Sequence, residues 1–154
     1  MKLIKVKIVN KGDLKNYKIL EVPENMTLYK FAEVIVKQFG FYFDHAFGFY
    51  DNLENPFDSK EVYELFTDMD DIEHTPNAKG VERYYFVSDL FNHNKKMLFY
   101  FDYGDSWKFI LELLDSSQQV LKVPKNYYRL YESHGDDPEQ YPEIDDGNGQ
   151  QFPN

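Results

Sequence analysis

The stretch over residues 99–114, FYFDYGDSWKFILELL, constrains the fold more than any other part of the sequence. Two aromatic-rich runs flank Gly104 and Asp105, and both residue types readily occupy turn positions that need positive φ. Apolar runs on both sides of such a dipeptide predict a β-hairpin with a two-residue turn. The hairpin in turn requires a larger sheet, because an isolated pair of strands is marginally stable in water.

A two-residue turn also fixes which side chains share a face, because opposite residues of an antiparallel pair point the same way. Tyr100 is then expected opposite Phe109. We expect the core face to carry Leu98, Tyr100, Trp107, Phe109, Leu111 and Leu113. The other face would expose the rings of Phe99, Phe101 and Tyr103, which makes it a candidate surface for a partner.

The N-terminal part of the chain predicts a pair of strands followed by a helix. Residues 2–9 alternate, and every even-numbered side chain from Ile4 to Ile8 is apolar, which is typical of a strand with one buried face. Thr27 is placed to act as the N-cap of a helix over residues 28–39. Helical spacing gives this helix one apolar stripe, formed by Leu28, Phe31, Ala32, Ile35, Val36 and Phe39.

These elements predict a single α+β domain over residues 1–123, with a mostly antiparallel sheet and one main helix packed on it. Residues 124–154 are acidic and rich in Pro and Gly, which predicts a loosely docked or mobile tail. The expected strands span residues 2–9, 17–22, 42–50, 97–103 and 107–114, with a shorter strand over 83–87 and a long loop over 68–80.

Composition limits the classes of partner. The formal net charge of −10 argues against direct nucleic-acid binding, which depends on Lys and Arg side chains that neutralise phosphates. The same charge favours a basic protein partner. The absence of Cys excludes disulfides and thiolate chemistry, and it favours a cytoplasmic location. No apolar run approaches the ~18 residues of a membrane span, so no membrane association is expected.

Residues 102–107, DYGDSW, preceded by FYF, carry the most specific motif of the chain. They resemble the YxYDFGDxW motif of the plasmid pRiA4b ORF-3-like family, which includes passenger proteins of transposable elements. Segments 22–41 and 44–49 resemble the strand–helix and His-x-x-x-Phe segments of that family. The resemblance implies a β-grasp (ubiquitin-like) element order and a role around mobile genetic elements. Phe47 and Phe109 stand at two positions where the family often carries His.

Carboxylates and one imidazole are the candidate functional groups. The candidate binding residues are Asp44, His45, Asp51, Asp102, Asp105 and Trp107. Carboxylates beside an imidazole can bind a divalent cation or work as an acid–base pair. The alternative is structural, because Asp102 and Asp105 can cap free N–H groups in the turn around Gly104. The sequence contains no GxSxG, GxGxxG, HExxH or P-loop motif, and we predict no metal site.

These observations predict a cytoplasmic, non-enzymatic interaction module that uses no cofactor and binds a protein partner. The alternative is a divalent-metal-dependent hydrolase or nuclease-like accessory enzyme that uses the clustered Asp residues and His45. A third hypothesis is an acidic decoy that mimics nucleic acid, whose binding to a basic protein would weaken as salt screens the charges.

Overall fold

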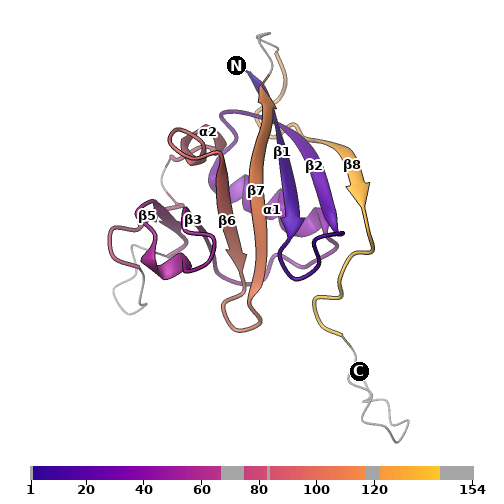
Figure 1. The fold of residues 1–154 in the computed structure, drawn as a ribbon. Helices are drawn as coiled ribbons and strands as arrows, with labels where there is room; N and C mark the ends of the chain where they lie inside the picture. The colour runs from indigo at the N-terminus through magenta and orange to yellow at the C-terminus, as the bar shows by residue number, and fades with distance from the viewer. Residues whose placement is uncertain (1, 67–74, 83, 117–121, 143–154) are drawn as a thin grey trace, which may run out of the picture.

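The computed structural model describes residues 2–66, 75–82, 84–116 and 122–142 (Figure 1). The strands are β1 (Leu3–Asn10), β2 (Tyr17–Pro23), β3 (Phe47–Tyr50), β4 (Val62–Glu64), β5 (Lys79–Gly80), β6 (Lys96–Phe101), β7 (Trp107–Ser116) and β8 (Arg129–His134). The helices are α1 (Leu28–Gln38), α2 (Val87–Leu90) and the 3-10 helix η1 (Pro56–Asp58). The fold is α+β, and the eight-stranded sheet has the order β5-β4-β3-β6-β7-β1-β2-β8. All neighbouring strands are antiparallel except β4 and β5.

Strands β1 and β2 form the predicted N-terminal hairpin. Ile4, Val6 and Ile8 are buried, as their alternation with polar residues predicts. Val6 lies opposite Leu20 of β2 on one side and Leu113 of β7 on the other. Strand β1 is therefore an interior strand that joins the N-terminal hairpin to the β6–β7 hairpin.

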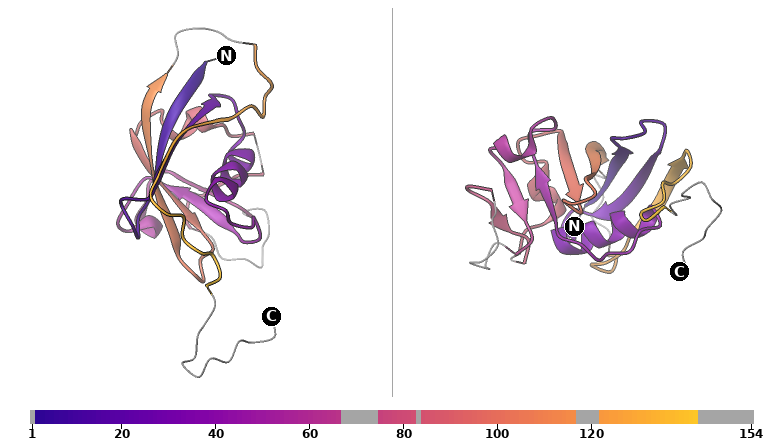
Figure 2. Two further views of the ribbon diagram at one scale, coloured as in Figure 1. Left: turned by 90° about the vertical axis from the view of Figure 1, so that its right-hand side faces the viewer. Right: turned by 90° about the horizontal axis from the view of Figure 1, so that it is seen from below.

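Helix α1 begins where the sequence predicts it. The Thr27 side chain caps the helix by accepting a hydrogen bond from the Lys30 N–H at 3.2 Å. Gly40 follows the helix at a φ of +79°, a conformation that glycine adopts without strain. Helix α1 lies on one face of the sheet (Figure 2), and Phe31 of its apolar stripe stacks on Phe49 of β3 with ring centroids 6.2 Å apart.

The β6–β7 hairpin is present, but the predicted two-residue turn is wrong. Phe101 pairs with Trp107 and Phe99 pairs with Phe109, so residues 102–106 connect the two strands. The pairing is shifted by one residue from the predicted one, and such a slip moves every side chain of a strand to the opposite face. The turn is wider than predicted because Asp102, its first residue, accepts hydrogen bonds from two later N–H groups of the turn. The Ser106 N–H donates to the Asp102 carbonyl oxygen, and the Asp105 N–H donates to the Asp102 side chain.

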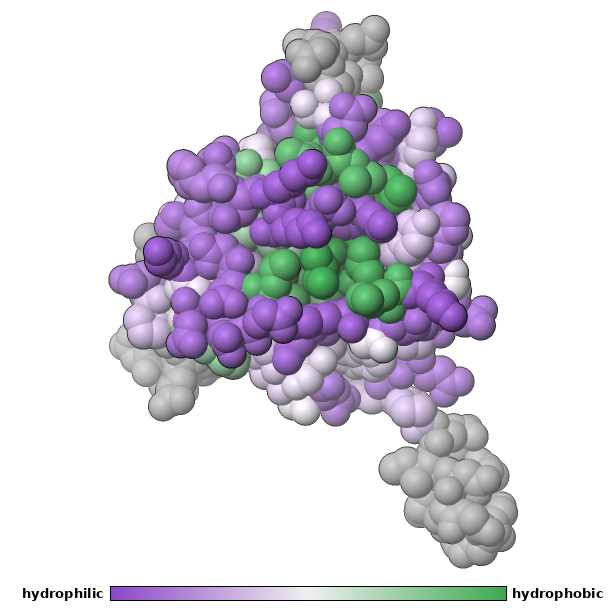
Figure 3. Space-filling view, in the orientation of Figure 1, coloured by the Kyte–Doolittle hydropathy of each residue, from purple (hydrophilic) through white to green (hydrophobic). Residues whose placement is uncertain are grey.

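The shifted register reverses the predicted faces of β6. Phe99 and Phe101 are fully buried in the main core on the helix side, so the predicted exposed ring face is wrong. Phenylalanine rings build this core, and Phe99 lies 5.0 Å from Phe49 between centroids. A smaller cluster on the other face contains Tyr50, Val62, Leu98 and Tyr100. Figure 3 shows that other face, where two apolar patches are separated by a hydrophilic row.

Two expected strands also differ. The strand predicted over residues 42–50 begins only at Phe47, which pairs with Phe101, the last residue of β6. Of the strand predicted over residues 83–87, the described part contains only a single antiparallel bridge between Phe86 and Thr27, because α2 begins at Val87. Residues 68–74 of the expected loop over 68–80, and Arg83 of the expected strand, lie outside the described part.

The segment over residues 124–154, expected to be a loosely docked or mobile tail, contains one strand in its described part. Residues 129–134 form β8, which extends the sheet beside β2. The side chain of Lys18 in β2 is almost fully buried, and its Nζ lies 2.9 Å from Asp137 Oδ1. A buried ammonium needs an anionic partner, which explains why an acidic part of this segment docks here. Residues 143–154 lie outside the described residues.

Within the described part of the chain, neither α-helix has the length and apolar character needed to cross a membrane.

Candidate functional site

The structure brings three of the six predicted site residues together. Asp44 and His45 lie in the loop before β3, and Asp102 follows β6. The two segments meet because the Asp102 N–H donates to the Ala46 carbonyl oxygen at 3.0 Å. His45 Nε2 lies 3.3 Å from Asp102 Oδ2 and 3.6 Å from Asp44 Oδ1. We call Asp44, His45 and Asp102 the acidic site.

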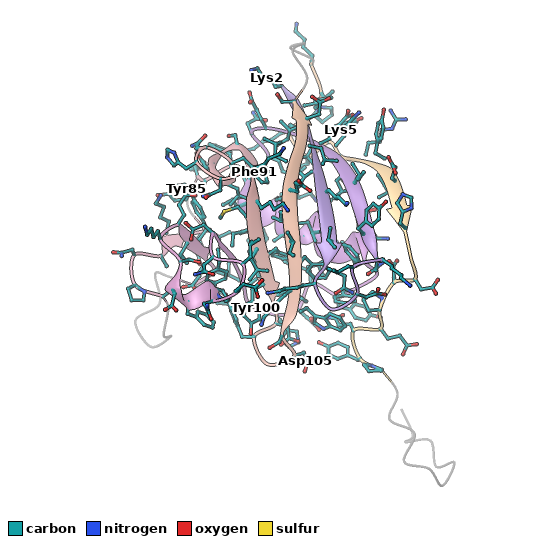
Figure 4. All side chains as sticks on the ribbon, viewed as in Figure 1. Lys2, Lys5, Tyr85, Phe91, Tyr100 and Asp105 are labelled. Atoms are coloured by element: carbon teal, nitrogen blue, oxygen red, sulfur yellow. The ribbon has the colours of Figure 1, made fainter. Side chains whose placement is uncertain are left out.

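Asp102 has the turn-capping role that the sequence offered as the structural alternative. Its Oδ1 accepts a hydrogen bond from the Asp105 N–H at 3.2 Å, and its carbonyl oxygen accepts one from the Ser106 N–H at 2.6 Å. Asp102 and Ser106 both have positive φ, at 62° and 60°, which widens the turn. Asp105 is exposed and projects from the tip of the hairpin (Figure 4).

Two buried polar atoms at this turn lack a hydrogen-bond partner within the described part of the chain. They are Asp102 Oδ2 and Trp107 Nε1. Asp102 is only 5% exposed, so its second carboxylate oxygen is largely withdrawn from water. The proximity of His45 Nε2 supplies electrostatic contact when His45 is protonated, but not a hydrogen bond of good geometry. Unsatisfied buried polar atoms are uncommon and often mark functional sites.

The C-terminal segment completes the surroundings of the acidic site. The Tyr141 hydroxyl donates to Asp44 Oδ2 at 2.9 Å, so its oxygen is free to accept from His45 Nε2, which lies 2.6 Å away. Desolvation and the carboxylates of Asp44, Asp102 and Asp105 together raise the pKa of Tyr141 to about 12. Tyr141 is therefore a neutral hydrogen-bond donor throughout the physiological pH range.

Gln140 fixes this segment against the loop before β3. Its Oε1 accepts from the Tyr42 N–H at 2.7 Å, and its Nε2 donates to the Tyr42 carbonyl oxygen and to Asp44 Oδ1, each at 3.1 Å. Sequence reasoning missed Gln140 and Tyr141, because they lie in a polar stretch with no periodic pattern. The only signal is one glutamine and one tyrosine among acidic residues and prolines.

Of the remaining predicted site residues, Asp105 shares the turn with Asp102, whereas Asp51 and Trp107 have other neighbours. Asp51 follows β3 at its opposite end, where its Oδ1 accepts from the Lys60 N–H at 3.0 Å. Trp107 opens β7 and packs edge-on against Phe41, with ring centroids 4.7 Å apart. No group of three or more His, Cys, Asp or Glu side chains among the described residues is arranged to hold a metal ion.

A second polar cluster lies on the face of the sheet opposite α1. The Tyr50 hydroxyl donates to Glu64 Oε2 and lies 2.8 Å from the Tyr103 hydroxyl. Burial is the main cause that raises the pKa of both tyrosines above the ordinary value. Gly48 lies under these hydroxyls, and a Cβ there would come within 2.6 Å of the Tyr50 oxygen. This cluster is a satisfied buried network with a packing role.

Comparisons with known proteins address the fold and the family. A solved structure of a protein of unknown function from Methanosarcina mazei Go1 is similar with a TM-score of 0.67 and 20% sequence identity. The match covers 86% of this chain and 69% of that chain, and at this identity it supports the fold alone. A comparison with curated proteins finds no match. The family model described as plasmid pRiA4b ORF-3-like protein matches residues 3–146. This chain therefore belongs to the plasmid pRiA4b ORF-3-like family, as the motif at residues 102–107 predicts.

Proposed function

We propose that this chain is a non-enzymatic protein-interaction module whose acidic site receives a positively charged side chain of a partner protein. The observation that carries the proposal is the buried Asp102 Oδ2, which has no hydrogen bond within the described residues. An ammonium or guanidinium group would supply both the missing donors and the opposite charge. Such a partner would offset the free-energy cost of burying the charged Asp102 carboxylate.

The charges around the acidic site support a cationic ligand. Asp44 and Asp102 belong to the site, and the exposed Asp105 lies on the same turn as Asp102. In the described part of the chain, no Lys or Arg forms an ion pair with any of these three carboxylates. The overall charge of −10 would also steer a basic partner toward the protein.

Fluorescence anisotropy with a labelled oligo-arginine peptide tests the proposal. We expect Asp102→Asn to weaken binding by about 10-fold or more, because a hydrogen bond to a charged group contributes roughly 1.5–3 kcal/mol. Asp51→Asn is the matched control, since it removes the same charge at the other end of β3. It should change the affinity by less than about twofold.

Measurements at about 0.01 M and about 0.15 M ionic strength separate local contacts from long-range attraction, because the Debye length falls from roughly 30 Å to 8 Å. Equal losses in Asp102→Asn and Asp51→Asn would mean that only the net charge matters and would refute a defined site. Absence of binding at the lower ionic strength would refute the cationic ligand altogether.

A second candidate is a divalent-metal-dependent hydrolase or nuclease-like accessory enzyme. Its acid–base chemistry is supported by His45 Nε2, which lies within 3.6 Å of carboxylate oxygens from both Asp44 and Asp102, although these three side chains are not arranged as a metal site. Mg²⁺, Mn²⁺, Ca²⁺ or Zn²⁺ bound at this site would raise the thermal midpoint in proportion to dose. Asp102→Asn and His45→Ala would then abolish the rise, whereas an unchanged midpoint with every ion would count against this candidate.

The remaining parts of the proposal have narrower support. A role around mobile genetic elements is supported by the plasmid origin in the family description. A β-grasp relationship is supported by the order strand, strand, helix, strand at the start of the chain. A cytoplasmic location is supported by the absence of Cys.

A further inference from the structure

We infer that residues 135–141, here called the C-terminal strap, are an intramolecular occupant of the acidic site that a partner must displace. This inference rests on the proposed function, because it concerns the regulation of the same site. The strap follows the edge strand β8 and ends at Tyr141, which contacts Asp44 and His45. The wild-type chain would then bind its partner more weakly than the acidic site itself allows.

The first part of the strap is anchored to the β1–β2 hairpin. Gly135 has a φ of +78°, and a Cβ there would come within 2.6 Å of the Lys15 carbonyl oxygen. Asp137 Oδ1 then lies 2.9 Å from the buried Lys18 Nζ and accepts from Asn16 Nδ2 at 3.3 Å. Separating Asp137 from the buried Lys18 would leave an unpaired charge, which costs free energy. This end of the strap therefore stays attached, while its far end can leave the acidic site.

The far end of the strap is hydrogen-bonded to the backbone of the loop before β3. The Gln140 amide contacts both the N–H and the carbonyl of Tyr42, which is how a neighbouring strand would satisfy the same backbone groups. Gln140 is only 7% exposed, so these hydrogen bonds are shielded from water. The strap therefore satisfies the backbone N–H and carbonyl groups of Tyr42 in the loop before β3.

The strap also satisfies both oxygens of Asp44 with neutral donors. Gln140 Nε2 donates to Oδ1 and the Tyr141 hydroxyl donates to Oδ2. It leaves Asp102 Oδ2 without a hydrogen bond. Hydrogen bonds from charged donors are about twice as strong as those from neutral donors. A cationic side chain that reaches both carboxylates can therefore replace the strap, which donates hydrogen bonds to Asp44 but none to Asp102 Oδ2.

The test uses the full chain and the same labelled oligo-arginine peptide. Gln140→Ala with Tyr141→Phe removes the side-chain contacts of the far end and keeps the aromatic ring. Apparent affinity falls in proportion to the fraction of competent molecules, so releasing the strap should strengthen binding by about 5- to 50-fold. Tyr131→Phe in β8 removes a hydroxyl away from the acidic site and should change the affinity by less than about twofold.

Hydrogen exchange at the Tyr42 amide gives an independent readout, because that N–H donates to Gln140. Saturating peptide should speed its exchange in the wild-type chain. An unchanged affinity in the double variant, or a protected Tyr42 amide in the peptide complex, would overturn the inference while leaving the proposed function intact. Weaker binding by the double variant would mean that the strap forms part of the binding surface. Absence of binding by both chains would overturn the proposed function together with the inference.

Discussion

Truncation of Phe99 measures the register of the β6–β7 hairpin directly. The Phe99 ring is fully buried and pairs across the sheet with Phe49 and Phe109. A buried aromatic side chain hides roughly 150–250 Å², which at about 25 cal/mol per Å² gives about 4–6 kcal/mol as an upper bound. Phe-to-Ala changes in protein cores cost about 3–5 kcal/mol, and we expect Phe99→Ala to lower the free energy of unfolding by that amount.

Urea denaturation followed by circular dichroism is the assay, and Phe57→Ala is the matched control. Phe57 is 56% exposed, so its truncation should cost about 1 kcal/mol or less. If Phe99→Ala prevents folding, Phe99→Leu should still fold with a loss of about 1–2 kcal/mol. Equal losses for Phe99→Ala and Phe57→Ala would place the Phe99 ring in solvent and would refute the observed register.

Three further outcomes are expected. Gly48→Ala should lower the free energy of unfolding by about 1–3 kcal/mol, because its Cβ would lie 2.8 Å from the Tyr103 hydroxyl oxygen, and an unchanged thermal midpoint would contradict this. Tyr141 should ionise near its pKa of about 12 in a wild-type minus Tyr141→Phe absorbance titration, whereas a step near 10 would contradict the site geometry. Because the folded pKa exceeds the unfolded one, the associated stability is present below about pH 10 and is lost as pH rises toward 12. Thr27→Ala should cost about 1 kcal/mol through loss of the helix cap, and equal denaturation midpoints would show that the cap contributes nothing.

Helix α1 and the first hairpin could be predicted because the apolar side chains of each element lie mainly on one face. The stripe from Leu28 to Phe39 and the alternation in β1 leave only one face that can be buried. Strand β6 has no such asymmetry, because both of its faces carry apolar side chains. The register then depends on the turn, where Asp102 accepts hydrogen bonds from the Asp105 and Ser106 N–H groups and so favours a wider turn than a two-residue Gly-Asp turn.

The acidic site could be predicted only in part. Asp44, His45 and Asp102 are among the residues named from the sequence, and the pairing of β3 with β6 brings them together. Asp51 is close to Asp44 in sequence, but β3 separates the two residues by its full length. The contribution of Tyr141 depends on the docking of the C-terminal segment, which no local pattern encodes.

The antiparallel pairing of β1 with β7 sets the order in which the sheet can assemble. This pairing joins Asn10 to Phe109 and Val6 to Leu113, residues that lie far apart in the sequence. Long-range pairing of this kind slows folding, because a large loop must close before the contact is gained. On the ribosome, both edges of the N-terminal hairpin stay unpaired until later strands are synthesised, because β1 pairs with β7 and β2 pairs with β8. The interval before that closure is the stage at which a nascent chain most needs protection from aggregation.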